Sequence, residues 1–349
     1  MKLVKTVEAE GAILCHDITQ IIPNVSKGPV FKKGHIVTKE DIPVLLSVGK
    51  ENLYVWEAKE GMMHEDDAAE VLRMIVMGDD PSMYASVPSE GKISIYAACD
   101  GLLTIRRDKL TAINSIGQMM IATIAGDRSV HKGDMLAGTR VIPLVIEEEI
   151  MNQAKEAAGD TGILSVLPYK LKKYALVITG SEVAAGRIAD GFAPVLEGKM
   201  SEYDMTCIGK SYPGDDRKAI TNDILKFADA GADIILCSGG MSVDPDDRTP
   251  GAIKDTGAAI ISYGAPSLPG AMFLLSYLHV RDKDIPVLGV PGCAMYNKRT
   301  ILDLVLPRIL AGQALTFSDL AAYGEGGLCR GCEECRFPNC SFGIGGGKP

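Results

Sequence analysis

The chain has 349 residues, of which 46% are hydrophobic, which is enough for two or three domains that each bury a core. Its formal net charge of −9 at pH 7 is spread along the sequence and leaves no basic stripe for a phosphate backbone, so we do not expect a nucleic-acid partner. No run reaches the roughly 20 apolar residues of a membrane-spanning helix, so we expect a cytoplasmic protein without membrane contact.

The first half of the chain is expected to form two small α+β modules. Residues 1–60 combine short strand patterns and turns with a helical segment over Lys39–Leu46. Residues 61–165 add a helical pattern in HEDDAAEVLRMIVMG, strand patterns in ISIYAA and LLTI, and a helix over Glu147–Ala158.

The second half, residues 170–322, changes to a regular alternation of strands and helices. The segments YALVIT, IILC and PVLGV are short, apolar and not alternating in polarity, and helical segments lie between them. Such strands are typical of a parallel sheet that is covered on both faces. The sequence therefore predicts an α/β fold, with a three-layer parallel-sheet domain preceded by the smaller α+β modules.

Small residues follow three of these strands, at the sheet edge where α/β domains bind ligands. They are Gly180-Ser181-Glu182 after the first strand, Ser238-Gly239-Gly240-Met241-Ser242 after the second, and Pro291-Gly292-Cys293 after the third. Glycine allows a ligand to approach the backbone, and free amides there can bind an anion. Tight turns alone would also explain each loop, although three at one edge favour a ligand.

Acidic residues also follow the predicted strands, namely Glu182, Asp215, Asp216, Asp246 and Asp247. Carboxylates at such positions can hold a divalent metal or orient an oxyanion substrate. Helix capping is an equally good explanation for any single one of them, and Asp215 and Asp216 directly precede a helical segment.

These loops resemble the molybdopterin-binding domain family, which is shared by the MogA, MoaB and MoeA proteins of molybdenum cofactor biosynthesis. The resemblance covers about 150 residues. It rests on Thr179-Gly180-Ser181-Glu182-Val183, on Ser238-Gly239-Gly240-Met241-Ser242-Val243 followed by Asp247, on Pro213-Gly214-Asp215-Asp216, on Pro269-Gly270 before an expected helix AMFLLSYL, and on Val290-Pro291-Gly292.

The resemblance implies a pterin and phosphate site and an acidic site beside it. The residues implied in cofactor binding are Thr179, Gly180, Ser181, Ser238, Gly239, Gly240, Met241, Ser242, Pro269, Gly270, Pro291, Gly292 and Cys293. Glu182, Asp215 and Asp247 would be the catalytic acids that handle molybdate and magnesium.

The sequence departs from the family pattern at three places. Ser181 replaces an aspartate, Asp244 stands where glycine is expected, and Cys293-Ala294 replaces Asn-Pro in the last turn. These changes affect the expected catalysis more than the expected binding. The Cys293 thiolate could contact molybdenum, although a small buried thiol is the simpler interpretation.

The N-terminal segment PVFKKGHIVTKEDIPVLLSVGKENLYV is similar to the segment that precedes this fold in the MoeA-like, molybdenum-inserting branch. Those enzymes also have a β-domain after the pterin domain, for which residues 323–349 leave no room. Proteins with this domain commonly form dimers or trimers, so we expect a homo-oligomer.

Residues 323–349 form a tail in which Cys329, Cys332, Cys335 and Cys340 have the spacing C-x2-C-x2-C-x4-C. The spacing is one residue longer than that of bacterial iron–sulfur ferredoxins, whereas zinc sites more often use two pairs separated by a longer loop, so an iron–sulfur cluster and zinc both remain open. A tail with few apolar residues should be flexible unless a metal orders it.

Three functions follow from these features. The first is a molybdopterin molybdenumtransferase that uses magnesium to insert molybdate into adenylylated molybdopterin and release the adenylyl group. The second is a non-catalytic carrier or sensor of the molybdenum cofactor that docks onto a molybdoenzyme through the cysteine tail. The third is a nucleotide pyrophosphatase like the competence-damage proteins, in which the related domain lies at the N-terminus rather than at the C-terminus.

Overall fold

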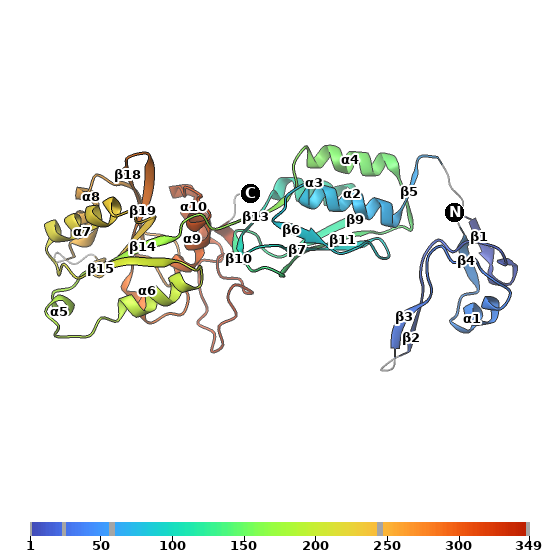
Figure 1. Ribbon diagram of the computed structural model, residues 1–349, viewed down its shortest axis with the longest axis horizontal. Coiled ribbons are helices and arrows are strands. Elements are labelled where there is room, and N and C mark those ends of the chain that lie inside the picture. The colour runs from blue at the N-terminus through green and yellow to red at the C-terminus, as the bar shows by residue number, and fades with distance from the viewer. Residues whose placement is uncertain (1, 23–25, 56–59, 243–246, 347–349) are drawn as a thin grey trace. The chain divides into compact units, whose positions relative to one another are not determined.

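The computed structural model describes residues 2–22, 26–55, 60–242 and 247–346 and separates into two compact units (Figure 1). Unit 1 comprises Met1–Tyr96, Arg106–Ile124 and Met135–Ser165, and unit 2 comprises Ala97–Ile105, Ala125–Asp134 and Val166–Pro349. Within the described residues, no helix is both long and apolar enough to cross a membrane.

The N-terminal part of unit 1 is a small α+β fold. Its elements are β1 (Lys2–Lys5), a 3-10 turn (Thr6–Glu8), β2 (Ile18–Ile22), β3 (Ser26–Phe31), α1 (Asp41–Ser47) and β4 (Asn52–Val55). Strand β1 pairs with β4 and β2 pairs with β3, both antiparallel. Leu14, Ile18, Leu45 and Leu53 are among the residues that form its core. Helix α1 covers most of the helical segment expected over Lys39–Leu46.

The rest of unit 1 is an antiparallel sheet with helices on one face (Figure 1). The sheet order is β6 (Met83–Ala85), β7 (Lys92–Ala97), β11 (Met135–Val141) and β9 (Met119–Thr123), and β5 (Met62–His64) pairs separately with β12 (Val145–Glu147). The helices are α2 (Glu65–Met77), α3 (Arg107–Ile116) and α4 (Glu148–Ala158). Each has an acidic residue in its first turn, which the helix dipole favours, and α2 and α4 end at Gly78 and Gly159 with positive φ.

Glu65 is a buried acid at the start of α2, with a residue exposure of 7%. Burial, and to a smaller extent the negative charge of Asp66, raises its pKa from 4.5 to about 7, although Arg140 and Lys33 act in the opposite direction. A carboxyl whose pKa is higher in the folded state than in the unfolded state binds its proton more tightly when folded. Its ionisation therefore opposes folding as the pH rises from about 4.5 through 7.

Glu65→Gln should consequently stabilise the protein at alkaline pH, by up to about 3 kcal/mol at pH 8, and leave it nearly unchanged at pH 4. Urea denaturation at both pH values, followed by circular dichroism, measures this difference. Asp67→Asn, at an exposed position in the same helical turn, is the matched control and should show no such pH-dependent gain. An equal effect of Glu65→Gln at both pH values would refute the explanation.

Unit 2 contains a six-stranded mixed sheet in the order β15, β14, β16, β19, β18, β17. The bounds are β14 (Lys173–Ile178), β15 (Thr206–Ser211), β16 (Ile234–Ser238), β17 (Ala259–Tyr263), β18 (Leu274–Val280) and β19 (Lys283–Val290). Strands β15, β14, β16 and β19 are parallel. A second sheet, formed mostly by residues of this unit, has the order β10 (Arg128–Val130), β8 (Gly101–Ile105) and β13 (Leu164–Leu167).

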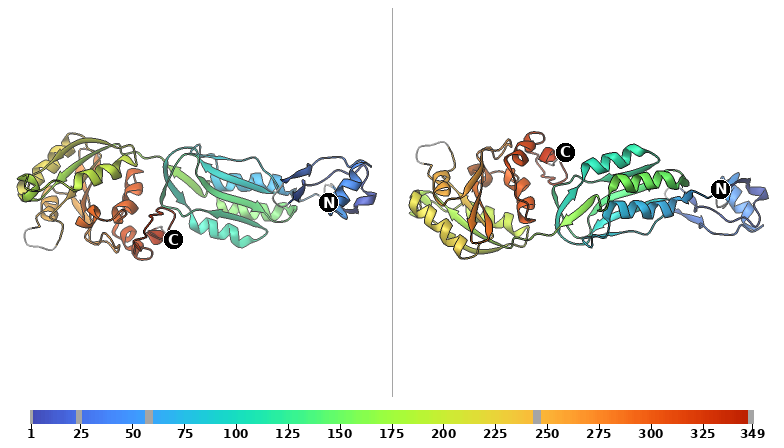
Figure 2. Two further views of the ribbon diagram at one scale, coloured as in Figure 1. Left: turned by 90° about the horizontal axis from the view of Figure 1, so that it is seen from below. Right: turned by 90° about the horizontal axis from the view of Figure 1, so that it is seen from above.

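Helices cover both faces of the six-stranded sheet, which confirms the α/β three-layer fold expected for residues 170–322 (Figure 2). The helices are α5 (Ser181–Ala184), α6 (Phe192–Ser201), α7 (Arg217–Asp229), α8 (Thr249–Asp255), α9 (Ile301–Leu310) and α10 (Phe317–Ala321). On one face of the sheet, Leu176 and Leu236 belong to the core that also contains residues of α6 and α9. On the other face, the alternate residues Ala175 and Ile235 belong to the core that also contains residues of α7 and α8. Both cores are closed to solvent, because these strand residues are fully buried.

The sheet differs from the expected all-parallel sheet at one side. Strands β18 and β17 are antiparallel to their neighbours, and a two-residue turn at Arg281 and Asp282 joins β18 to β19. The prediction of a helix over AMFLLSYL was therefore wrong, because this segment contributes most of β18. An unbroken apolar run does not distinguish a buried strand from a buried helix.

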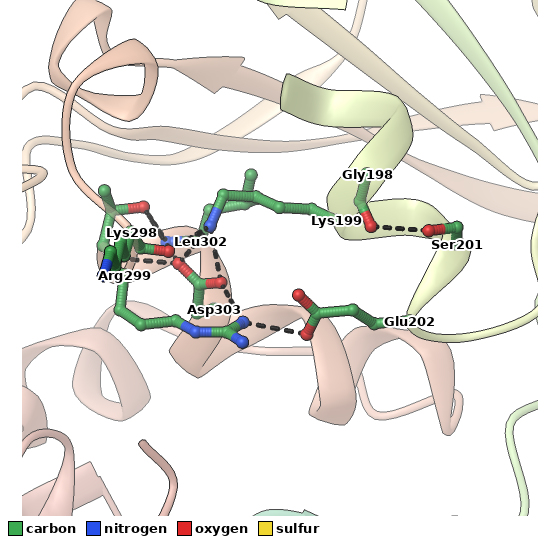
Figure 3. Close-up of polar contacts among 9 residues, drawn as sticks. Gly198, Lys199, Ser201, Glu202, Lys298, Arg299, Leu302 and Asp303 are labelled. Carbon is green, nitrogen blue, oxygen red and sulfur yellow. Dashed lines mark hydrogen bonds and ion pairs between the residues drawn. The ribbon is translucent and has the colours of Figure 1, made fainter. Parts of the chain in front are cut away.

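Helix α9 is buried along its whole length and has a charged residue at its start. Asp303 is 2% exposed. Its carboxylate accepts hydrogen bonds from Lys199 Nζ at 2.7 and 2.8 Å and from Arg299 Nη1 at 2.9 Å (Figure 3). The same carboxylate forms the capping box of α9 with Thr300. Arg299 also donates to Glu202 at 2.8 Å. Lys199 comes from α6, so this cluster fastens α6 to the start of α9.

Asp303→Ala should destabilise unit 2 by about 3–5 kcal/mol, because it leaves the buried ammonium of Lys199 without its carboxylate. Glu202→Ala removes a partly exposed partner of the same Arg299 and should cost less than about 1 kcal/mol. Amide hydrogen exchange of α9 and β14, measured by mass spectrometry on each variant, gives the loss of stability caused by each substitution. Similar costs for the two variants would contradict the assigned difference in burial.

Candidate functional site

The carboxyl ends of β14, β16 and β19 are adjacent in the sheet, so the loops that follow them meet at one edge. The turn after β16 contains two consecutive glycines. Gly239 and Gly240 both have positive φ, at 88° and 51°, and a Cβ on Gly239 would lie 2.5 Å from the carbonyl oxygen of Thr179. Glycine is thus required at Gly239 both by the backbone conformation and by the close contact.

Two buried threonines hold this turn in place. Thr179 Oγ1 donates to the Ser238 carbonyl at 3.1 Å and lies 3.1 Å from Thr249 Oγ1, which donates to the Gly239 carbonyl at 2.8 Å. Tyr263, at the end of β17, donates from its hydroxyl to the carbonyls of Met241 and Ser242, both at 3.1 Å. Sequence reasoning missed Tyr263, because β17 was not anticipated beside this loop.

A cavity of about 590 Å³ lies at this edge, and we call it the strand-end cavity. It is lined by Gly239, Gly240, Met241, Ser242, Asp247, Leu268, Pro269, Gly270, Ala271, Met272, Pro291, Gly292 and Cys293. Nine of the thirteen residues predicted to bind the cofactor line it, and Thr179, Gly180, Ser181 and Ser238 do not. Leu268, Ala271 and Met272 were missed, since they lie beside the turn to β18, which was expected to be a helix.

Asp247 lines the strand-end cavity with an acceptor that has no partner among the described residues. Its Oδ2 atom is buried and accepts no hydrogen bond from the described residues. The buried hydroxyl of Ser238, at the end of β16, likewise has no hydrogen-bond partner among them. A buried carboxylate oxygen without a donor is costly, which favours a ligand that supplies one. The neighbouring positions Val243, Asp244 and Asp246, named from the sequence, lie outside the described residues.

The other two expected catalytic acids are placed elsewhere. Asp215 accepts hydrogen bonds from the backbone amide of Ser181 at 2.8 Å and from its hydroxyl, so it fastens the start of α5. Glu182 is exposed on α5 and does not line the strand-end cavity, and Asp216 caps α7 through the amides of Lys218 and Ala219.

The described residues include no group of three or more His, Cys, Asp or Glu side chains arranged to hold a metal ion. Glu182, Asp215 and Asp247 therefore do not fit a shared magnesium site in this arrangement, and we derive no magnesium-dependent step.

Cys293 lies in the strand-end cavity beside Gly270. Burial raises the pKa of its thiol above the ordinary value, and contacts with the backbone of Cys293 and Gly270 lower it by a smaller amount. The neutral thiol is thus favoured over the thiolate near pH 7. Of the two interpretations from the sequence, the small half-buried thiol is the one that this environment favours.

The tail forms a second cavity of about 300 Å³, which we call the tail cavity. All four tail cysteines line it, together with Tyr296–Arg299. The end of the tail is packed against unit 2: Phe342 is 3% exposed, and a Cβ on Gly343 would lie 2.4 Å from a methyl group of Leu304 in α9. The glycines at the end of the tail thus allow close contact with α9, and the ordering of the tail by a metal stays a prediction from the sequence.

Comparison with known proteins identifies the domain that contains the strand-end cavity. Residues 175–311 match a family described as "Probable molybdopterin binding domain". The α/β domain of unit 2 belongs to the molybdopterin-binding domain family. It is thus a domain of the molybdenum cofactor biosynthesis type, and residues 3–57 match a separate "Domain of unknown function (DUF8806)".

Similar proteins come from several organisms. A stretch of 74 residues is 32% identical to the CinA-like protein of Mycobacterium avium (strain 104). This stretch covers 21% of this chain and 17% of the length of that protein. Two solved structures align with lower identity. The tungsten cofactor synthesizing protein MoaB from Pyrococcus furiosus is 16% identical, with 40% of this chain and 96% of that chain covered at a TM-score of 0.34. The molybdopterin biosynthesis enzyme MoaB from Thermus thermophilus is 18% identical, with 41% and 98% covered at a TM-score of 0.32.

Gly239→Ala should destabilise unit 2 by about 1–3 kcal/mol, since alanine at this φ is strained and its methyl group meets the Thr179 carbonyl. Gly292→Ala is the matched control at the same cavity, because an added Cβ there meets nothing within 4 Å. It should change the free energy of unfolding by less than about 0.5 kcal/mol. Urea denaturation followed by circular dichroism compares them, and a neutral Gly239→Ala would contradict the assigned constraint.

Proposed function

We propose that the strand-end cavity binds molybdopterin and that the protein takes part in molybdenum cofactor biosynthesis. The observation that carries the proposal is the unpartnered, buried Oδ2 of Asp247 in a cavity made by family-matched loops. A pterin ring presents adjacent N–H donors on its pyrimidine edge, and a carboxylate accepts two such donors well. Asp247 therefore supplies recognition of the pterin in this proposal.

The glycine turn supplies the other half of the recognition. Backbone amides in a turn with consecutive positive-φ glycines form a concave donor surface that suits a phosphate. Gly239 and Gly240 provide such a turn in the lining of the strand-end cavity, and the loop with Pro291 and Gly292 lines it as well. The volume of about 590 Å³ lies in the range of small-molecule sites, roughly 300–1,000 Å³.

The reaction proposed for the bound ligand is insertion of molybdate into adenylylated molybdopterin, with release of AMP. A role as a non-catalytic cofactor carrier or sensor is the second candidate, and a specific observation favours it. Asp215 is engaged with Ser181 and Glu182 is exposed, so two of the three expected acids lie outside the strand-end cavity. A homo-oligomer, a molybdoenzyme partner and a cytoplasmic location stay predictions from the sequence.

Asp247→Asn should weaken molybdopterin binding by about tenfold or more, because the amide replaces one acceptor oxygen by a donor that faces the pterin N–H groups. Asp229→Asn, at an exposed position at the end of α7, is the matched control and should bind like the wild type. Anaerobic titration of the full chain, followed by the quenching of pterin fluorescence, gives both dissociation constants. Equal affinities would remove Asp247 from the site, and no binding by the wild type would refute the proposal.

The same preparation separates the transferase from the carrier. Incubation with adenylylated molybdopterin, magnesium and molybdate should release AMP in a molybdate-dependent and Glu182-dependent way if the protein inserts molybdenum. Tight binding without AMP release would assign the carrier role instead.

A further inference from the structure

The four tail cysteines line one cavity, and the segment that carries them contains no helix or strand. Cys329, Cys332, Cys335 and Cys340 all line the tail cavity. Cys329 and Cys340 are half-buried and pack against the core that surrounds α9, whereas Cys332 and Cys335 are exposed. The thiols of Cys329 and Cys340 thus pack against the folded domain, and those of Cys332 and Cys335 lie on the exposed loop between them.

Hydrogen bonds hold both ends of this cysteine loop to other segments of unit 2. On one side, Leu268 donates to the Gly327 carbonyl and Cys329 donates to the Leu268 carbonyl, both at 2.8 Å. On the other side, the guanidinium of Arg128 donates to the carbonyls of Cys340 and Phe342 at 3.0 and 3.1 Å. The loop ends therefore have fixed positions, which reduces the entropy lost when the four thiols converge on one ligand.

Positively charged side chains line the tail cavity together with the cysteines. Arg299, held by Asp303 and Glu202 (Figure 3), lies 5.1 Å from the ring centre of Phe337, and Lys298, Arg330 and Arg336 also line the cavity. Four thiolates around a metal carry a net negative charge, and neighbouring cations stabilise both the thiolates and the completed centre.

We infer that Cys329, Cys332, Cys335 and Cys340 form a tetrathiolate site in the tail cavity that binds a thiophilic metal centre, either a zinc ion or an iron–sulfur cluster. Each thiol releases its proton to solvent as its sulfur bonds to the metal, and no oxidant or reductant is needed for ligation. The sulfurs are not gathered in the described arrangement, so binding draws the exposed Cys332–Cys335 segment inward.

This metal site is separate from the strand-end cavity but shares backbone with it. Leu268 lines the strand-end cavity and forms a parallel bridge with Leu328, which lines the tail cavity. In addition, the carbonyl of Cys293, a residue that lines the strand-end cavity, accepts hydrogen bonds from the backbone amides of Tyr296 and Asn297, which line the tail cavity. Metal loading would therefore fix one wall of the strand-end cavity.

The test measures metal in the full chain without any pterin, so its failure is independent of the proposed function. Protein is purified anaerobically and reconstituted in separate arms with Zn²⁺, with Co²⁺ as a spectroscopic probe, and with equal amounts of ferrous and ferric iron plus sulfide. We expect one zinc ion per chain with cobalt–thiolate charge-transfer bands, or bound iron with acid-labile sulfide and a broad visible absorption. These arms distinguish zinc from a cluster.

The double variant Cys332→Ser/Cys335→Ser should lose the metal, and its circular dichroism spectrum should be unchanged because both side chains are exposed. Cys99→Ser removes a thiol outside the tail and should retain the metal. The inference is overturned if the wild type binds no metal in any arm, or if the double variant binds as much as the wild type.

Discussion

The carboxylate of Asp303 lies inside unit 2, where an unpaired charge would be very costly, and the surrounding chain is arranged to match it with cations. Lys199 approaches from α6 and Arg299 from the turn before α9, while the same carboxylate closes the capping box of α9. This fixes the turn that connects the strand-end loop at Pro291–Cys293 to α9. Residues on this turn also line the tail cavity, so one buried charge cluster positions the walls of both cavities.

Sheet order explains why Asp247 lines the strand-end cavity and Asp215 does not. Asp247 follows β16, which lies in the middle of the sheet between β14 and β19, and it lines the cavity. Asp215 follows β15 at the sheet edge, and there it fastens α5 through Ser181. Asp247 and Asp215 follow strands in the same way along the chain but have different roles, because β16 ends at the glycine turn and β15 lies at the sheet edge. Glu182 follows the neighbouring strand β14, but its side chain is exposed on α5 and does not line the cavity.

Much of this fold follows from local sequence signals. The apolar runs that became β14, β16 and β19 and the glycines after them predicted both the layered domain and most of the cavity lining. Gly239 illustrates why: its positive φ and its contact with Thr179 allow no side chain, so the residue type itself carries the structural information.

The missed features depend on pairings between distant residues. The run Leu274–Val280 could form a strand or a helix, and only the hairpin with β19 makes it β18. The tail reads as polar and glycine-rich, yet Gly343 and Gly346 are needed because Leu304 and Tyr323 occupy the space of a side chain. Composition alone does not reveal a partner surface from another part of the chain. For the same reason, the cations that line the tail cavity from outside the tail were not foreseen.

The two proposed sites place different demands on the same backbone. Ligand entry to the strand-end cavity needs some freedom in the loops at Leu268–Met272 and Pro291–Cys293, which both line it. A metal in the tail cavity would restrict that freedom through the Leu268–Leu328 bridge. Under such coupling, molybdopterin and metal would each raise the affinity of the other by the same factor if both favour the ordered wall. A carrier that must hold a labile cofactor gains more from this arrangement than a transferase that must release its product after each turnover.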